Sequence, residues 1–163
     1  MLTLGIDPGT ATTGFGVVRQ TEKGLLHIVN GCIKTSPKNS AESRLALIFR
    51  QVSELIKRYQ PDYLAVERLF FGRNTTTAMA VGQARGMILL AAAQNKVALS
   101  EYTPLEVKMA LTGYGRADKK QVQIMVKTLL KLPGLPKPDD AADALAIAIC
   151  HLHSFRLKEG LLT

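Results

Sequence analysis

Several residue types that build specialised sites are scarce in this sequence. Among 163 residues there is no tryptophan, and the only cysteines are Cys32 and Cys150. The two cysteines lie far apart and match no metal-binding or redox spacing, which argues against a zinc site. Both lie in apolar stretches, so we interpret them as reduced core residues of a cytosolic protein.

Long hydrophobic runs are also missing. The longest apolar run covers residues 86–93, far too short to span a bilayer, and Met1 leads into a strand-like run rather than a signal peptide. A content of 47% hydrophobic and 21% charged residues is typical of a globular protein. We therefore expect one cytoplasmic domain over residues 1–155, followed by a loose C-terminal tail at 156–163.

Acidic residues are few compared with basic ones. Thirteen Asp and Glu face twenty-one Lys and Arg, and the formal net charge is +8. Residues 96–137 contain eight basic side chains and three acidic ones. This excess predicts a polyanionic partner such as nucleic acid, with a merely solvated basic face as the alternative.

The order of hydrophobic patterns predicts a mixed sheet. Residues 2–6, 14–19 and 25–35 read as strands joined by short turns, which indicates an antiparallel meander. Segments 62–67 and 97–102 are short strands separated by helical patterns, which is typical of parallel strands. Helices are expected at 41–59, 75–94, 104–113, 118–132 and from 139 onward. The fold class is therefore α/β, with a five-stranded sheet of three antiparallel strands followed by two parallel ones, flanked by helices.

Four acids fall where open α/β sheets place their sites. Asp7 ends the first strand and Glu67 ends the fourth, so parallel pairing of these strands would bring them to one edge. Asp140 and Asp143 are three residues apart and share a face of the last helix. Helix capping is the alternative for acids in a first turn, and we assign that role to Asp139.

Clustered carboxylates repel one another unless a cation neutralises them. Carboxylate oxygens suit Mg²⁺ or Mn²⁺, because both prefer hard oxygen ligands. Two such ions about 4 Å apart are a common arrangement for phosphodiester cleavage. The four acids therefore predict a nuclease with two Mg²⁺ ions, for which Mn²⁺ would substitute.

Several motifs carry a family resemblance over most of the chain. The segments Gly5-Ile6-Asp7-Pro8-Gly9-Thr10, Ala65-Val66-Glu67, Gly82-Gln83-Ala84-Arg85-Gly86 and Asp140-Ala141-Ala142-Asp143-Ala144-Leu145-Ala146 resemble the bacterial RuvC-type Holliday junction resolvases. The resemblance implies an RNase H-like fold, a homodimer, and Mg²⁺-dependent nicking of two opposed strands of a four-way junction with 5′-phosphate products. It implies partnership with a RuvA–RuvB branch-migration complex. It also implies that the family's metal-binding acids fall on Asp7, Glu67, Asp140 and Asp143.

The resemblance extends to residues that would contact DNA. It places Lys108 and Lys119 at or near the active site, where a lysine could bind a phosphate oxygen or stabilise charge in the transition state. A solvated lysine in the first turn of a helix is the alternative for Lys119. We expect further DNA contacts from Arg73, Arg116 and Lys120.

An aromatic pair follows the strand that ends in Glu67. Phe70 matches an aromatic residue that the family places beside unpaired bases, where stacking contributes about 1–3 kcal/mol per base. Core packing and stacking both remain open for the adjacent Phe71.

Glycines inside predicted elements indicate close approach of other groups. Gly14 and Gly16 in the second strand indicate either a bulge or the close approach of another chain or ligand. Gly82 and Gly86 leave a flat groove on a helix, which indicates either intramolecular packing or the dimer interface. We assign these two glycines to the interface.

Three other functions compete with junction cleavage. An actin-like or sugar-kinase-like phosphotransferase would need a second copy of the domain, which this chain does not contain. Another RNase H-like nuclease could act on RNA or on other branched DNA. A non-catalytic DNA-binding module would have no reason to keep four site-like acids.

Overall fold

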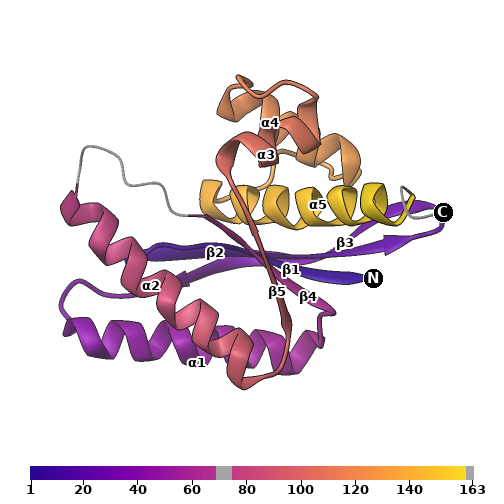
Figure 1. Ribbon diagram of the computed structural model, residues 1–163. Helices are drawn as coiled ribbons and strands as arrows, with labels where there is room; N and C mark the ends of the chain where they lie inside the picture. Colours follow the sequence, from indigo (N-terminus) through magenta and orange to yellow (C-terminus); the bar gives the residue numbers. More distant parts are fainter. Residues whose placement is uncertain (69–74, 161–163) are drawn as a thin grey trace.

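A mixed β-sheet with helices on both faces forms the centre of the molecule (Figure 1). The computed structural model describes residues 1–68 and 75–160, with side chains described for 1–68 and 78–155. The strands are β1 (Leu2–Asp7), β2 (Thr12–Thr21), β3 (Gly24–Lys34), β4 (Tyr63–Glu67) and β5 (Ala98–Tyr102). The helices are α1 (Ala41–Tyr59), α2 (Thr75–Gln94), α3 (Pro104–Thr112), α4 (Lys119–Leu129) and α5 (Asp139–Gly160).

The strand order is β3-β2-β1-β4-β5. β1, β2 and β3 pair in antiparallel fashion, whereas β4 pairs in parallel with both β1 and β5. The predicted α/β fold with three antiparallel and two parallel strands is therefore confirmed. The parallel register sets Ile6 opposite Val66, so β1 and β4 end at the same edge of the sheet.

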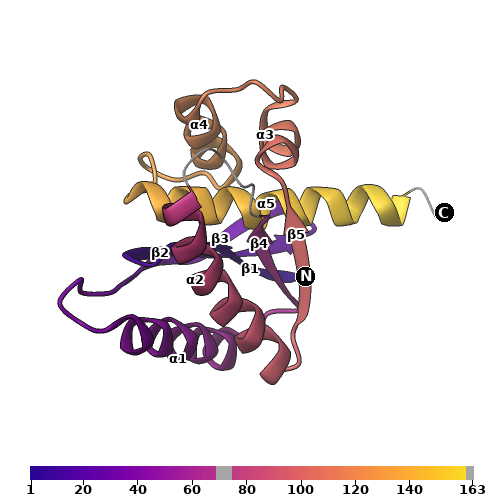
Figure 2. The same cartoon turned by 60° about the vertical axis from the view of Figure 1, so that its left-hand side comes forward.

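Two hydrophobic layers hold the helices to the sheet. On one face, Leu4, Ile6 and Val66 are fully buried beneath α1 and α2. On the other face, α5 lies directly on the sheet, and α3 and α4 stand beside each other on top of it (Figure 2). Burial of these alternating side chains supplies most of the stabilisation, at about 25 cal/mol per Å² of apolar surface.

Glycines on β1 and β2 let α5 lie unusually close to the sheet. A Cβ atom at Gly14 would stand 2.0 Å from the backbone oxygen of Asp140, and one at Gly5 would stand 2.1 Å from that of Ala144. At Gly14 the sequence left open a bulge or the close approach of another chain or ligand, and the group that approaches is instead a helix of the same chain. It fixes the height of the first turn of α5 above the strands.

The last helix is longer than expected. We expected a loose tail from residue 156, but α5 continues to Gly160. That expectation was wrong for residues 156–160, because the sequence from His153 to Glu159 contains no glycine or proline to end a helix. No helix within residues 1–68 and 75–160 is long and apolar enough to cross a membrane.

Candidate active site

Four acids converge where β1, β4 and α5 meet. Asp7 ends β1 and Glu67 ends β4, and these strands are parallel neighbours. The first turn of α5 crosses β2 at Gly14, which brings Asp140 and Asp143 toward the same edge. The sheet and the helix therefore bring together the acids that the sequence singled out.

The carboxylates of this acidic cluster (Asp7, Glu67, Asp140 and Asp143) affect one another electrostatically. Burial first, and then the charges of the other three acids, raise the pKa of Asp7 to about 7. Burial also raises the pKa of Glu67, with a further contribution from the charge of Asp143. For Asp143, burial raises the pKa while the Lys119 ammonium opposes the shift. The cluster therefore holds its negative charges at a cost in free energy.

This donor set suits a hard divalent cation. All four side chains offer carboxylate oxygens, the ligands that Mg²⁺ and Mn²⁺ prefer. Within the part of the chain that is described, no three such side chains already stand close enough to enclose a metal ion. The raised pKa values nevertheless mark the place where a positive charge would relieve the most repulsion.

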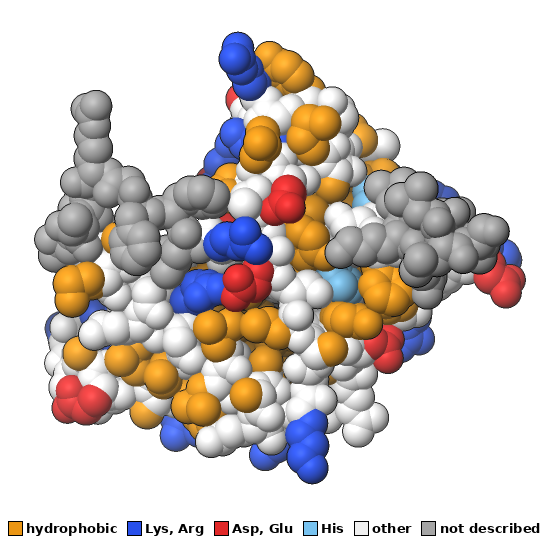
Figure 3. All heavy atoms as spheres, viewed as in Figure 1, with side chains coloured by type: hydrophobic (Ala, Val, Ile, Leu, Met, Phe, Trp, Pro, Cys, Tyr) orange, Lys and Arg blue, Asp and Glu red, His pale blue; other side chains and the backbone are white. Residues whose placement is uncertain are grey.

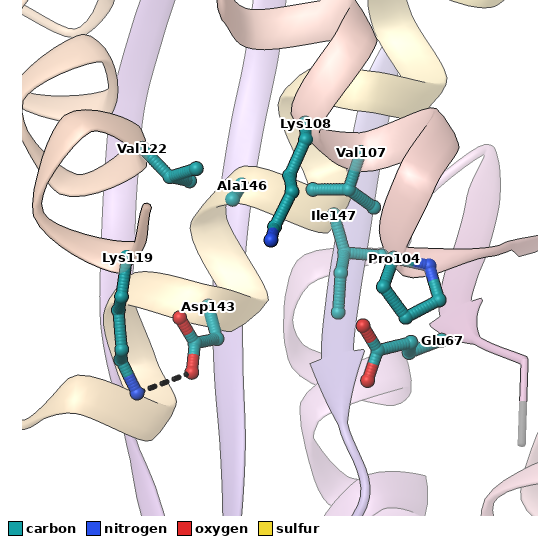
Figure 4. Close-up of a pocket in the computed structure, with 9 residues that line it drawn as sticks. All are labelled: Glu67, Pro104, Val107, Lys108, Lys119, Val122, Asp143, Ala146 and Ile147. Atoms are coloured by element: carbon teal, nitrogen blue, oxygen red, sulfur yellow. Dashed lines mark hydrogen bonds and ion pairs between the residues drawn. The ribbon is translucent and has the colours of Figure 1, made fainter. Parts of the chain in front are cut away.

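Lys119 provides one positive charge at the edge of the cluster. It is the first residue of α4, which Asp118 caps by accepting a hydrogen bond from the Gln121 backbone N–H. Its Nζ donates to Oδ2 of Asp143 at 3.0 Å, the contact drawn as a dashed line in Figure 4. This hydrogen bond raises the pKa of the Lys119 amine, so the side chain stays protonated.

Lys108 extends into the same pocket from α3. The pocket is lined by Glu67 on one side and by Asp143 and Lys119 on the other. In Figure 4, Lys108 points from α3 toward the space between Asp143 and Glu67. Two lysines and two carboxylates from four separate elements therefore line one hollow.

Asp139 does not have the capping role that we assigned to it. α5 begins at Asp139, and the backbone N–H groups of Ala141 and Ala142 donate to the carbonyl oxygen of Pro138. The Asp139 carboxylate turns instead toward α4, where it lies 3.5 Å from Lys119 Nζ and accepts from Gln123 at 3.1 Å. The capping assignment was wrong because the Asp139 side chain contacts Lys119 and Gln123 on the preceding helix instead.

The other predicted DNA-binding residues divide into two groups. Arg116, between α3 and α4, and Lys120, on α4, are exposed, whereas Lys108 is half-buried and lines the pocket. Phe70 and Arg73 lie outside the described residues. Their roles stay predictions.

The glycines assigned to the dimer interface lie on α2. A Cβ atom at Gly86 would meet nothing within 4 Å, so packing among the described residues does not require glycine there. Gly82 is half-buried on the same helix. Packing among the described residues therefore does not account for Gly86.

A hydrogen-bond chain that sequence reasoning missed holds the turn after Asp7. The Thr35 hydroxyl donates to the Thr10 carbonyl oxygen at 2.6 Å and accepts from Arg44 Nε at 2.7 Å. The Thr10 hydroxyl in turn donates to the Ala80 carbonyl oxygen at 2.9 Å. No short motif signals this arrangement, because its members come from four separate parts of the chain.

Comparison with known proteins agrees with this geometry. A family model described as crossover junction endodeoxyribonuclease RuvC matches residues 3–151. The RuvC of Desulforamulus reducens is 55% identical over 151 residues, covering 93% of each chain. That of Rubrobacter xylanophilus is 57% identical, covering 95% of this chain and 87% of its own.

Solved structures give the same result. The RuvC structure of Thermus thermophilus has a TM-score of 0.91 and 39% identity and covers 97% of both chains. The same Thermus protein in complex with a Holliday junction substrate has a TM-score of 0.92 and covers 97% of this chain and 96% of its own.

The mixed sheet and the acids at its carboxyl edge define the class as an RNase H-like α/β protein. Within that class, the chain belongs to the RuvC family of crossover junction endodeoxyribonucleases.

Proposed function

We propose that this chain is a structure-specific endonuclease that resolves Holliday junctions by paired nicks in opposed strands during recombination and repair. The observation that carries the proposal is the acidic cluster beside Lys119, in a chain of the RuvC family. The Thermus relative in complex with a Holliday junction substrate supports four-way junction DNA as the substrate.

Asp7, Glu67, Asp140 and Asp143 would hold two Mg²⁺ ions, with Mn²⁺ as a substitute. The bound ions would activate a water molecule and stabilise the leaving oxygen, leaving a 5′-phosphate. The chain contributes rigid placement of the ligands. Asp7 and Glu67 lie at the ends of paired strands, and the close contact of α5 with Gly14 limits movement of Asp140 and Asp143. A small displacement of reacting groups costs about 10²-fold in rate, so this rigidity matters for turnover.

Lys119 would stabilise negative charge that develops on the phosphate. Its ammonium already lies 3.0 Å from Asp143 and stays protonated. With the acids neutralised, the same ammonium would be able to donate to a phosphate oxygen. A single positioned donor of this kind contributes about 10²–10³ in turnover.

The DNA would cross the basic α3–α4 layer beside the pocket. Lys108 points into the pocket (Figure 4). Arg116 and Lys120 are exposed. Phe70 would stack on an unpaired base at the centre of the junction, and Arg73 would contact the backbone nearby. These contacts would combine charge neutralisation with recognition of the branch point.

Paired nicks require two active sites, so we propose a homodimer. Gly82 and Gly86 of α2 would form its interface, because no described residue occupies the space beside Gly86. By family membership, the dimer would act in the cytoplasm with a RuvA–RuvB branch-migration complex.

A substrate panel tests the proposed function directly. Equal amounts of a four-way junction, a linear duplex and an RNA–DNA hybrid would be incubated with Mg²⁺ or with EDTA. We expect symmetric nicks in the junction alone, only with Mg²⁺, and products that ligase reseals because they carry 5′-phosphates. Equal cleavage of the hybrid would instead assign the chain to another RNase H-like activity.

A further inference from the structure

An ion cluster (Arg68, Arg85 and Glu101) lies on the face of the sheet opposite the Glu67 carboxylate. The Glu101 carboxylate accepts from Arg85 of α2 through one oxygen, while its other oxygen lies 3.7 Å from Nε of Arg68. Figure 3 shows basic and acidic side chains next to one another in the middle of this face, over the region of β5. One carboxylate therefore links α2, β5 and the residue that follows Glu67.

The members of this cluster differ in exposure. The side chain of Arg85 is 17% exposed, that of Glu101 is 31% exposed and that of Arg68 is 54% exposed. Arg85 Nε is buried with no hydrogen-bond partner among the described residues. The Glu101 carboxylate therefore provides the main balance for the positive charge of the Arg85 guanidinium. A partly buried arginine without its carboxylate would be costly, which makes the Arg85–Glu101 pair the fixed part of the cluster. Arg68 is the more exposed and more loosely held member of the cluster.

The end of β4 depends on β5 for its position. Pairing between β1 and β4 stops at Ile6 and Val66, whereas pairing between β4 and β5 continues to Glu67 and Tyr102. One residue further, the Arg68 backbone N–H donates to the Tyr102 carbonyl oxygen at 2.7 Å. Glu67 is thus held from one side only, and this is the side on which Glu101 lies.

Because side chains alternate along β4, the ion cluster and the Glu67 carboxylate lie on opposite faces of the sheet. Val66 belongs to the core beneath α1 and α2, and Glu101 is its partner across the strands, so both side chains lie on that face of the sheet. Arg68 lies near Glu101, whereas Glu67, between Val66 and Arg68, points to the opposite face. The ion cluster is therefore separate from the pocket that Glu67 lines. Any effect of the cluster on Glu67 would have to pass through the backbone of β4.

We propose that Glu101 is a positioning residue for Glu67. By tying Arg68 to Arg85, it keeps the unpaired side of β4 from fraying and holds the Glu67 carboxylate at the distance that the other acids require. This inference rests on the proposed function only for the cleavage measurements. The order of the β4 end is a property of the chain by itself.

Two variants test the positioning role, with Glu22→Gln on the distant β2–β3 turn as the matched control. Glu101→Gln keeps the size of the side chain but removes its charge, and Arg68→Ala removes only the exposed arm. In both we expect faster amide exchange at Arg68 and unchanged exchange at Ala65. Single-turnover cleavage should fall by about tenfold or more, while junction affinity in EDTA stays unchanged. Glu101→Asp, which restores the charge, should recover part of the rate.

Three results would overturn the positioning role. Normal exchange at Arg68 in a folded Arg68→Ala or Glu101→Gln protein would show that the cluster does not order the strand end. Weaker junction binding with a normal single-turnover rate in Arg68→Ala would make Arg68 a DNA contact instead. Faster exchange throughout the sheet would reduce the role of Glu101 to general stability.

The same measurements separate this inference from the proposed function. If Glu101→Gln does not fold, Arg68→Ala supplies the test, because a partly exposed ion pair contributes little to stability. If the unmodified chain does not cleave junctions, the proposed function fails, while amide exchange at Arg68 still decides whether Glu101 orders the end of β4.

Discussion

The ammonium of Lys119 lies 3.0 Å from the Asp143 carboxylate and links the first turn of α4 to that of α5. The two helices are joined by a loop, so the contact fixes their relative position at the site. It also brings a positive charge to a cluster of acids whose pKa values are raised by burial. A residue in this place can affect both the organisation of the acids and the binding of phosphate.

Substituting Lys119 should separate these effects. We expect Lys119→Ala to slow cleavage by about 10²-fold or more at saturating enzyme while leaving junction affinity almost unchanged. Lys120→Ala is the matched control, because it removes a neighbouring exposed lysine and should mainly weaken binding. Single-turnover kinetics and gel-shift affinities measure the two quantities. A pure binding defect in Lys119→Ala would reduce its role to a backbone contact.

Asp143→Asn should abolish cleavage but keep junction binding. The substitution removes the negative charge of one proposed metal ligand and leaves the size of the side chain almost unchanged. Asp139→Asn, four residues earlier on the same helix, should retain most activity, since that carboxylate points toward Lys119 and Gln123. Cleavage assays in Mg²⁺ compare the two proteins. Cleavage at the unmodified rate by Asp143→Asn would refute its assignment as a ligand.

The stability of the metal-free protein should depend on pH through Asp7. The pKa of Asp7 is raised from 3.8 to about 7, so the folded chain retains a proton that the unfolded chain has released. The free energy of unfolding in EDTA should therefore fall as pH rises from about 4 to about 7, by at most about 1.4 kcal/mol per pH unit, and then level off.

Two comparisons check that this pH dependence comes from Asp7. Asp7→Asn should flatten the slope and be more stable than the unmodified chain at pH values above about 7, whereas Glu22→Gln should change neither. Adding Mg²⁺ above that pH should raise the denaturation midpoint of the unmodified chain, because ligands of the folded state stabilise it. An unchanged slope in Asp7→Asn would contradict the raised pKa.

Gly86→Leu should convert dimers into monomers. A Cβ atom at Gly86 would meet none of the described residues within 4 Å, so we expect the monomer to fold normally. Gly134→Leu makes the same change at another open glycine and should leave the dimer intact. Sedimentation velocity measures the oligomeric state. Dimers that persist in Gly86→Leu would place the interface elsewhere.

Junction affinity should fall steeply with salt concentration. The basic α3–α4 layer would bind phosphates and release counterions, so the logarithm of affinity should decrease linearly with the logarithm of salt. Replacing Arg116 or Lys120 with alanine should reduce that slope by about one each. An affinity that is insensitive to salt would remove the basic layer from the DNA path.

The sequence predicts the site best where an acidic residue directly follows a recognisable strand pattern. The alternation of residues 2–6 and the short apolar strand before Glu67 predict two strand ends, and acids at strand ends are positioned by topology alone. The parallel pairing of β1 and β4 that this requires is present. The amino-acid pattern thus predicts that Asp7 and Glu67 end strands, and the parallel pairing of those strands places them at one edge of the sheet.

Features that depend on distant contacts cannot be predicted in this way. Asp139 and Asp140 look equally suited to cap a helix, and only the position of Lys119 and Gln123 on α4 decides where the Asp139 carboxylate turns. Glu101 reads as an ordinary polar residue of a short strand. Its significance comes from Arg85 and Arg68, which lie on other parts of the chain.

The narrow gap between the sheet and α5 limits how this protein can change. A single methyl group at Gly5 or Gly14 would overlap the backbone oxygen of Ala144 or Asp140, and helix backbone cannot rotate away as a side chain can. The carboxylates of Asp140 and Asp143 would then be lifted off the strands that carry their partners, although every acid would still be present. Substitution of Gly5 or Gly14 could thus abolish activity although neither residue takes part in the chemistry. A relative that keeps all four acids is therefore not necessarily active.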